Sequence, residues 1–338
     1  MKKKLLLTSF GTNAALAHLE YFKFVPHIEL YLSDMNPNSK IRSLTSNFIP
    51  TISAASPNYI NDILHKAQNN KIDMIIPGAD EEAFKLMKKQ SIFESKGIIV
   101  AVQPQQHLSI LQSKNTVNQL LKKKGFEIPP YRVFRNKESF LKSLDDLRYP
   151  EKPLLLKPNS GRGGRGITIL TETPFLYPDP LPMVPKNFFL QQIDGSIEYV
   201  IMELLRGTIY DVDVLHYQND EVFFGIRKRI NNITNLFSGN IFEHNDSIFE
   251  LAKNVYNVLP TKYLMDYDVF LGNDGKVSLI EINPRPSGST VSYIPLGINL
   301  YHVLAESYLF GKNISIEIDN LPISVVTYYK MMVDNYQR

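Results

Sequence analysis

Two carboxylates in the last quarter of the sequence are spaced so that they could share a metal ion. Residues 263–290 hold two alternating runs on either side of Asp274-Gly275, a strong signal for a two-residue turn, and therefore predict a β-hairpin. This turn places Asp268 opposite Glu281, where two carboxylates lie about 5 Å apart and repel each other. A sequence keeps such a pair where a cation neutralises it, although a solvated acidic face is the alternative interpretation.

The same register brings three more polar side chains to this face. Asp266 lies opposite Asn283, and Arg285 follows on the same side because side chains alternate along a strand. Ligands that are all oxygen indicate a hard ion, and Mg²⁺ commonly binds through one or two carboxylates together with substrate phosphates. The residues after Glu281, Asn-Pro-Arg and then Ser-Gly-Ser, favour a metal site over a solvated face.

Two lysines and a glycine-rich segment are further candidate functional residues. Lys114 follows the helix-capping Ser113 and lies in the first helical turn, the wrong end for a cation beside the helix dipole. Lys157 interrupts an apolar strand at residues 153–158. The segment 159–166, NSGRGGRG, then has four glycines that free the backbone to approach phosphate oxygens: Gly161, Gly163, Gly164 and Gly166. A surface lysine and a floppy hairpin loop are the alternative interpretations.

The order of these motifs resembles that of the ATP-grasp superfamily, and most closely its carbamoyl-phosphate-synthetase-like members. Glu281-x-Asn-Pro-Arg with an acid across the hairpin resembles the metal strand of this superfamily. The pattern K-P-x-x-G-x-G-G-x-G from Lys157 is similar to its glycine-rich loop. The segment S-K-N-T-x-x-x-L-x-x-x-G-F-x-x-P from Ser113 resembles the one whose lysine reaches the nucleotide phosphates. The resemblance extends over nearly the whole chain and implies ATP and Mg²⁺, as one or two ions, with Mn²⁺ as an alternative.

A strand at residues 199–205 resembles the hinge between the two lobes, where backbone groups of the superfamily read adenine. The resemblance implies nucleotide contacts at Glu203 and Leu205. Many members carry a glutamate two residues after the hinge glycine, where it contacts the ribose, but this chain has Ile209 there. Asp211, two residues further along the same strand face, could substitute for it.

Two arginines and several polar residues are candidate substrate contacts. Arg227 and Arg229 share one face of the strand 221–229 and would bind phosphate or carboxylate if they face a cleft, whereas edge-strand protection is the alternative. Two acids lie at the carboxyl end of the strand 72–76, where parallel sheets bind ligands, but they also suit a helix N-terminus. The predicted substrate contacts are Asp80, Glu82, Ser287 and Gly288.

The pattern of predicted elements indicates an α/β protein. Strands alternate with helices over residues 1–112, which predicts a doubly wound parallel domain and resembles the pre-ATP-grasp domain. The resemblance implies a two-lobed ATP-grasp domain with antiparallel sheets after it. We expect its small lobe over residues 113–199 and its large lobe, with the metal hairpin and a C-terminal helix and strands, over residues 200–338. Five prolines in 172–187 predict an irregular segment.

Composition excludes several functional classes. A length of 338 residues predicts two or three packed lobes. The net charge of +3 is too small to indicate a nucleic-acid partner. The absence of cysteine excludes disulfides, thiolate metal sites and thiol nucleophiles. The first apolar run stops at Thr8 and no run approaches the length of a membrane span, so we expect a cytoplasmic protein without a membrane partner.

The function implied by the resemblance is that of an ADP-forming carboxylate–amine ligase, with a small carboxylate and an amine as substrates and a homodimer as one possible assembly. Mg²⁺ would be held by Asp268, Glu281 and Asn283. The expected catalytic residues, which would stabilise the transferred phosphoryl group, are Arg285, Arg229 and Arg227. A small-molecule kinase and a nucleotide-binding module without turnover are the alternative functions.

Overall fold

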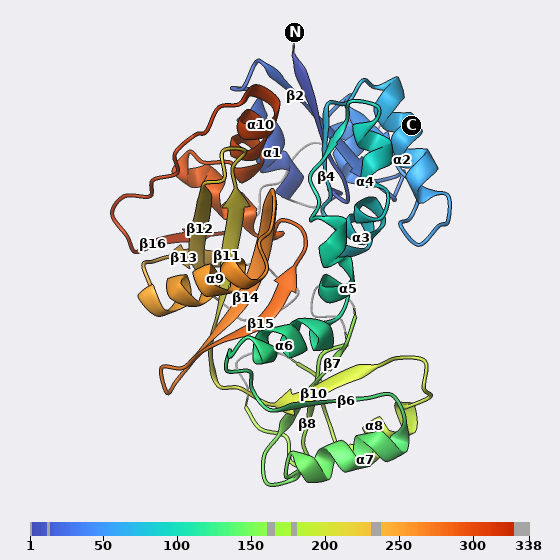
Figure 1. Cartoon of the computed structure of the whole chain (residues 1–338), viewed down its shortest axis with the longest axis vertical. Helices are drawn as coiled ribbons and strands as arrows, with labels where there is room; N and C mark the ends of the chain where they lie inside the picture. Colours follow the sequence, from blue (N-terminus) through green and yellow to red (C-terminus); the bar gives the residue numbers. More distant parts are fainter. Residues whose placement is uncertain (1, 12–13, 161–165, 177–180, 231–237, 328–338) are drawn as a thin grey trace.

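The computed structural model describes residues 2–327 except 12–13, 161–165, 177–180 and 231–237. Within this part of the chain, three sheets follow one another along the longest axis of the molecule (Figure 1). The first domain lies at one end of this axis and the small lobe at the other, with the large lobe between them. The predicted α/β fold is confirmed, with a parallel first domain and two lobes whose strands pair antiparallel apart from one parallel pair in the small lobe.

The first domain is a parallel sheet with strand order β3-β2-β1-β4-β5. Its central strand is the apolar run Leu5, Leu6 and Leu7, fully buried as expected for a parallel strand covered on both faces. Its strands are β1 (Lys3–Leu7), β2 (Ile28–Asp34), β3 (Phe48–Pro50), β4 (Met74–Ile76) and β5 (Ile99–Val100). Its helices are α1 (Ala14–Phe22), η1 (Lys40–Ser43), α2 (Tyr59–Asn69), α3 (Asp80–Met87), α4 (Gln90–Glu94), η2 (Gln105–His107) and α5 (Leu108–Leu111).

The strand order of this sheet reverses between β1 and β4, so a crevice is expected at their carboxyl ends. The two ends approach closely, because a Cβ added to Gly78 would lie 2.4 Å from the carbonyl oxygen of Thr8. Only glycine fits at this position. Helix α3 begins two residues later with Asp80, which places that carboxylate at the crevice.

The small lobe is a sheet of order β6-β10-β7-β8-β9 with its own core of Phe134, Phe140 and Phe189. Its elements are β6 (Tyr131–Phe134), α7 (Lys137–Asp146), β7 (Leu154–Pro158), β8 (Thr168–Leu170), β9 (Met183–Val184), α8 (Lys186–Gln192) and β10 (Tyr199–Glu203). The boundary expected at 199/200 is wrong, because β10 pairs with β6 and β7 and the sheet therefore extends to Glu203. The proline-containing segment is also more regular than expected, since β9 pairs with β8.

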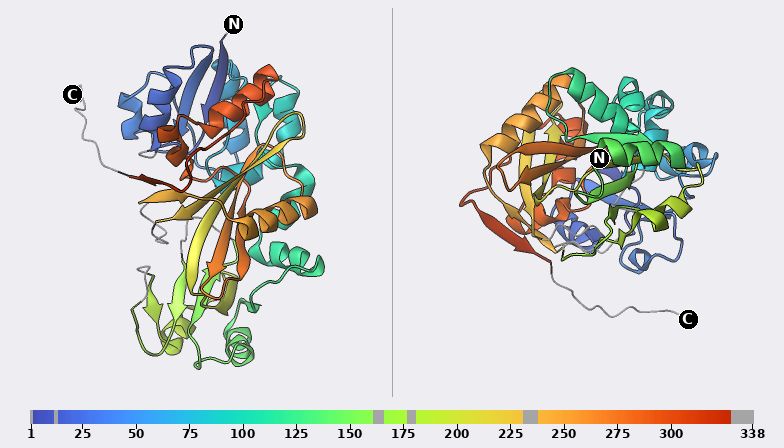
Figure 2. Two further views of the ribbon diagram at one scale, coloured as in Figure 1. Left: turned by 90° about the vertical axis from the view of Figure 1, so that its left-hand side faces the viewer. Right: turned by 90° about the horizontal axis from the view of Figure 1, so that it is seen from below.

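The large lobe is an antiparallel sheet of order β15-β14-β11-β12-β13-β16. Its strands are β11 (Gly207–His216), β12 (Val222–Arg229), β13 (Gly239–Phe242), β14 (Leu264–Gly272), β15 (Val277–Asn283) and β16 (Ile323–Val326). Its helices are α9 (Asp246–Val258), η3 (Thr290–Leu296) and α10 (Leu300–Phe310). Figure 2 shows β16, in dark red, at the outer edge of this sheet. Among the described helices of the protein, none has the length and apolarity needed to cross a membrane.

Alternation along the strands gives this sheet one apolar and one charged face. Tyr210, Val212 and Val214 of β11 share a core with α9. Asp211 and Asp213 alternate with these core residues along the strand, so their side chains point to the other face of the sheet. That core continues into the first domain and into α6 (Lys114–Lys123), the helix that carries the first candidate lysine and contacts β15.

The predicted hairpin exists, but its turn differs from the prediction. The amide of Gly272 donates to the carbonyl oxygen of Lys276 at 2.8 Å, so the loop has three residues and ends with Gly275 at φ +80°. This longer loop shifts the pairing by one residue, and Val269 faces Leu279. A β-bulge at Ile280 then restores the predicted register, and Asp268 lies opposite Glu281 after all.

Candidate active site

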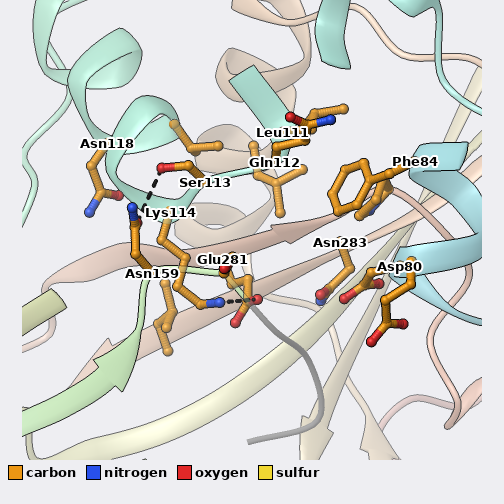
Figure 3. A pocket seen from close by; sticks show the side chains of 16 residues that line it. Asp80, Phe84, Leu111, Gln112, Ser113, Lys114, Asn118, Asn159, Glu281 and Asn283 are labelled. Carbon is orange, nitrogen blue, oxygen red and sulfur yellow. Dashed lines mark hydrogen bonds and ion pairs between the residues drawn. The ribbon is translucent and has the colours of Figure 1, made fainter. Parts of the chain in front are cut away.

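A pocket of about 470 Å³ lies where the three parts of the chain meet. The start of α3, the N-terminal turn of α6, the end of β7 and the end of β15 all line it (Figure 3). The polar side chains that line it include Asp80, Gln112, Lys114, Asn118, Asn159, Glu281 and Asn283. This set joins residues predicted separately as phosphate, metal and substrate contacts.

The predicted metal residues lie side by side on β14 and β15. Asp268 is paired with Glu281 in the ladder, and Asp266 is paired with Asn283. The side-chain amide of Asn283 donates to Oδ2 of Asp266 at 3.0 Å, which leaves its amide oxygen as the atom that could bind a cation. The arrangement brings together the all-oxygen donor set that suits Mg²⁺.

Buried negative charge dominates the electrostatics of this hairpin. Burial, together with the neighbouring carboxylates of Asp211 and Glu281, raises the pKa of Asp268 to about 6, although Arg229 opposes the shift. Burial and the same crowding raise the pKa of Asp266 well above its ordinary value. One carboxylate oxygen of Asp266, Oδ1, is buried and has no hydrogen-bond partner among the described residues. A divalent cation would relieve this repulsion, so the donor set fits Mg²⁺.

Both candidate lysines contact β15, the strand that carries Glu281. Nζ of Lys114 lies 3.0 Å from Oε1 of Glu281 (Figure 3). Nζ of Lys157 donates to the carbonyl oxygen of Ile280 at 3.3 Å, which the bulge leaves without a partner residue on β14. Burial lowers the pKa of Lys157 to about 8, against the attraction of Glu281, and the nearby Lys114 lowers it further. Two cations therefore converge beside the predicted metal ligands.

Asn159 holds Lys114 in this position, and sequence reasoning missed it. Its side-chain oxygen accepts hydrogen bonds from the Ser113 hydroxyl at 3.1 Å and the Asn115 amide at 3.0 Å. Its backbone carbonyl accepts from the Lys114 amide at 3.1 Å. These bonds satisfy free N–H groups at the start of α6 and tie that helix to the end of β7. The signal available in the sequence is a small amide residue between the Lys-Pro strand and the glycines.

An ion pair joins the first domain to the metal strand. Nε of Arg285 lies 2.9 Å from Oδ1 of Asp80, and both side chains are almost buried. The guanidinium also lies 4.0 Å from Asp266. Arg285 therefore places one positive charge between α3 and the acidic hairpin. Burial lowers the pKa of Arg285, but the charge of Asp80 outweighs this effect and the pKa is raised.

A family profile described as ATP-grasp in the biosynthetic pathway with Ter operon matches residues 196–328, from just before β10 to just after β16. A solved ADP complex of N5-carboxyaminoimidazole ribonucleotide synthetase shares the fold over 90% of this chain, with a TM-score of 0.67 and 18% identity. The chain has the ATP-grasp fold. A search of curated proteins finds no significant match to the sequence.

Three ATP-grasp structures illustrate the likeness. N5-carboxyaminoimidazole synthetase from Staphylococcus aureus, complexed with ADP, has a TM-score of 0.64 and 14% identity, over 91% of this chain and 77% of that one. The biotin carboxylase domain of Hydrogenobacter thermophilus 2-oxoglutarate carboxylase, with MgADP, ADP and bicarbonate, has a TM-score of 0.68 and 15% identity, covering 94% and 71%. L-amino acid ligase from Bacillus licheniformis has a TM-score of 0.63 and 15% identity, covering 91% and 74%. At these identities the likeness establishes the fold.

The position of Asp211 does not suit the ribose contact that was predicted for it. It is 1% exposed and lies in the middle of the sheet, paired in the ladder with Asp268. Its Oδ1 accepts two hydrogen bonds from Arg229, and its Oδ2 accepts one from the Ser289 hydroxyl at 3.1 Å. The prediction was wrong because strand alternation gives the face of a residue but not its depth along the sheet.

The two arginines of β12 differ in their surroundings. Arg229 is partly exposed, and its Nη2 lies 2.8 Å from Oδ1 of Asp268, beside the candidate metal site. Arg227 is fully buried, with Nε donating to Asp213 at 2.6 Å and Nη1 to Asn240 at 2.7 Å. The expectation that Arg227 faces the cleft as a catalytic residue is therefore wrong, and its contacts are structural.

The remaining predicted residues are spread around the site. Glu82 accepts a hydrogen bond from the Thr8 hydroxyl at 2.6 Å inside the first domain and does not line the pocket, so its assignment as a substrate contact is wrong. Ser287 is buried, with its hydroxyl 2.9 Å from that of Ser289, whereas Gly288 is exposed. At the hinge, the side chain of Glu203 pairs with Lys152 at 2.7 Å.

Part of the predicted glycine loop lies outside the described residues, namely Gly161, Gly163 and Gly164. Gly166 is described, and it has φ +76°, a left-handed conformation that favours glycine. A Cβ there would also lie 3.0 Å from the Pro158 ring. The role of the loop and the hinge contact at Leu205 stay predictions.

Replacing Lys157 by methionine is expected to weaken MgATP binding by more than tenfold, about 1.4 kcal/mol, because a cation is lost while the volume of the side chain is kept. Calorimetric titration measures this affinity.

In the wild type the affinity for MgATP should fall as the pH rises through about 8, because Lys157 loses its charge there. Lys157→Met should lack that dependence. Lys142→Met, at an exposed position on α7 of the same lobe, is the control and should bind like the wild type. Equal affinity in a folded Lys157→Met variant would remove Lys157 from the nucleotide site.

Proposed function

We propose that this ATP-grasp protein is an ADP-forming ligase that activates a carboxylate as an acyl phosphate and joins it to an amine. The observation that carries the proposal is the convergence of Lys114 and Lys157 on Glu281 and Ile280 of β15, at a pocket that also receives Asp80 from the first domain. Cations next to acidic metal ligands suit the polyphosphate end of ATP, and the pocket beside them has room for a small acceptor.

The metal site is proposed for Asp268, Glu281 and Asn283. When bound there, Mg²⁺ would neutralise charge on the phosphates of the nucleotide. Lys114 and Lys157 would hold the same phosphates, and backbone groups at the hinge would bind adenine. The raised pKa values of Asp266 and Asp268 show that their negative charges are unfavourable without a partner, and a bound cation would stabilise the ionised carboxylates.

The proposed reaction has two steps. A carboxylate oxygen of the substrate attacks the γ-phosphorus of ATP, and the bond from that phosphorus to the bridging oxygen breaks with release of ADP. The amine then attacks the carbonyl carbon of the acyl phosphate, phosphate leaves with the bonding electron pair, and the nitrogen loses a proton as the amide forms. The side chains would position the reactants and stabilise charge. Arg229, which contacts Asp268, and Arg285, which contacts Asp80, would act on the transferred group.

Hydroxylamine trapping tests this proposal, because an acyl phosphate reacts with hydroxylamine to give a hydroxamate whatever the natural amine is. The protein is incubated with MgATP, hydroxylamine and a panel of amino acids and other small carboxylic acids, and ADP and hydroxamate are measured together. We expect equal amounts of both products with an accepted carboxylate, and neither with Glu281→Gln. ADP release that follows a hydroxyl substrate and gives no hydroxamate would indicate a kinase. Nucleotide binding without ADP release across the panel would indicate a binding module.

A further inference from the structure

Three metal-ligating side chains meet at the junction of the first domain and the large lobe, away from the pocket. His27 lies just before β2, whereas His302 and Glu306 lie on α10. Nε2 of His302 is 3.2 Å from Oε1 of Glu306, and Nε2 of His27 contacts the same oxygen. One ligand atom from each residue lies within 4.8 Å of the others.

The local structure explains why these atoms converge. Asn299 caps α10 by accepting hydrogen bonds from the amides of Tyr301 and His302, and the four-residue spacing then places His302 and Glu306 on one helix face. The carbonyl of His27 accepts a hydrogen bond from the Lys3 amide at 2.9 Å, which fixes its backbone beside β1. The cluster therefore joins the turn before β2, which carries His27, to α10, which carries His302 and Glu306.

The surroundings of His302 match those of a metal-bound histidine. Its Nδ1 lies 3.0 Å from the Tyr21 hydroxyl on α1. With the Nδ1 hydrogen donated to that hydroxyl, Nε2 carries its lone pair toward Glu306, as for a ligand oriented by a second residue. The Phe310 ring packs against His27 at 5.2 Å between centroids. Glu306 is 4% exposed, whereas about half of the His27 side chain is exposed, so one side of the cluster is open to water.

Two imidazole nitrogens and a carboxylate oxygen that face one another can share protons or bind a metal ion, and their spacing of less than 4.8 Å suits a single ion. We propose that His27, His302 and Glu306 bind a divalent transition-metal ion, Zn²⁺ in the first instance, that joins the first domain to α10 of the large lobe. Two histidines and one carboxylate are a donor set of zinc proteins, with water in the fourth position. Mg²⁺ prefers oxygen ligands and should not compete. The site is independent of the proposed ligase activity.

Cobalt binding tests the proposal, because Co²⁺ in a tetrahedral nitrogen and oxygen site has visible d–d absorption. The full chain, without a histidine tag, is titrated with Co²⁺ in excess Mg²⁺, which keeps the acidic hairpin occupied. We expect one equivalent of Co²⁺ to give the band, Zn²⁺ to abolish it and further Mg²⁺ to leave it unchanged. Zn²⁺ should also raise the melting temperature of the protein.

Three variants complete the experiment. His27→Gln changes a half-exposed side chain and should remove the band without unfolding the protein. Tyr21→Phe should weaken Co²⁺ binding roughly tenfold by removing the partner of His302. His244→Gln is the matched control, because His244 also lies beside a carboxylate, Asp246 at 2.8 Å, but outside the cluster, and should bind like the wild type. Absence of the band in the wild type, or its persistence in His27→Gln, would overturn the proposal and make the cluster a proton-sharing contact.

Discussion

Replacing Asp268 by asparagine is expected to leave the metal-free fold at least as stable as the wild type and to reduce ATP-dependent turnover by roughly two to three orders of magnitude. The two effects have opposite signs because the same carboxylate is unfavourable in the folded chain and necessary in the proposed metal site. Its neighbours Asp211, Asp266 and Glu281 are all acidic, and the variant removes one charge from that group. Urea unfolding without metal and ADP release with saturating substrates measure the two effects.

The pH dependence of stability gives a second measure of Asp268. Its folded pKa is about 6, against an ordinary value of 3.8, so the folded protein binds a proton more tightly than the unfolded chain does. The metal-free wild type should therefore lose stability as the pH rises from about 4 to about 6, and this residue then contributes a constant cost on the order of 3 kcal/mol above that range. The stability of Asp268→Asn should not show the part of this decline that comes from residue 268. In the wild type, saturating MgATP should offset the destabilisation by the ionised carboxylate.

Asp274→Asn is the control for this experiment. Asp274 is an exposed acid on the same hairpin, and its carboxylate accepts a hydrogen bond from the Lys276 amide at the turn. Its replacement should affect stability slightly and turnover not at all. If Asp268→Asn instead lowered the metal-free melting temperature sharply while MgATP still stabilised the variant as much as the wild type, the carboxylate would be structural and the metal site wrong.

The hairpin shows how much of the site the sequence can predict. The pairing of Asp268 with Glu281 was correct, but it was derived from a two-residue turn that does not exist. The three-residue loop ending at Gly275 moves the register by one residue, and the bulge at Ile280 moves it back. Both deviations insert a residue, and neither leaves a clear signal in a run of alternating side chains. The facing carboxylates are strong evidence for a site, whereas the route of the backbone between them was not predictable.

Long-range contacts were beyond the reach of sequence patterns. Asp80 and Arg285 were expected as separate contacts of substrate and phosphate, yet they form one ion pair between the first domain and the large lobe. Asn159 belongs to no alternating pattern in the sequence, and its importance comes from five groups that other parts of the chain bring to it. Local alternation predicted the fold and the faces of its strands. The partner of each charged side chain depends on how the three parts pack.

The largest effect on stability is expected from Arg227→Met, which should destabilise the protein by about 3–5 kcal/mol. Arg227 is fully buried, and its partner Asp213 is 0% exposed. The variant leaves that carboxylate with a hydrogen bond from the Tyr293 hydroxyl at 3.0 Å but without its countercharge. Urea unfolding measures the loss. Arg132→Met, which breaks an exposed ion pair with Asp146, is the matched control and should change stability little.

A double variant separates the loss of the arginine from the cost of the stranded carboxylate. Arg227→Met combined with Asp213→Leu replaces the ion pair by apolar side chains and should recover a large part of the lost stability, because no buried charge is left alone. Arg229→Lys should behave differently, with a small change in stability and a large fall in turnover, since that side chain reaches Asp268 at the edge of the cleft. A folded Arg227→Met protein with unchanged stability and no turnover would reverse this assignment and return Arg227 to the reaction.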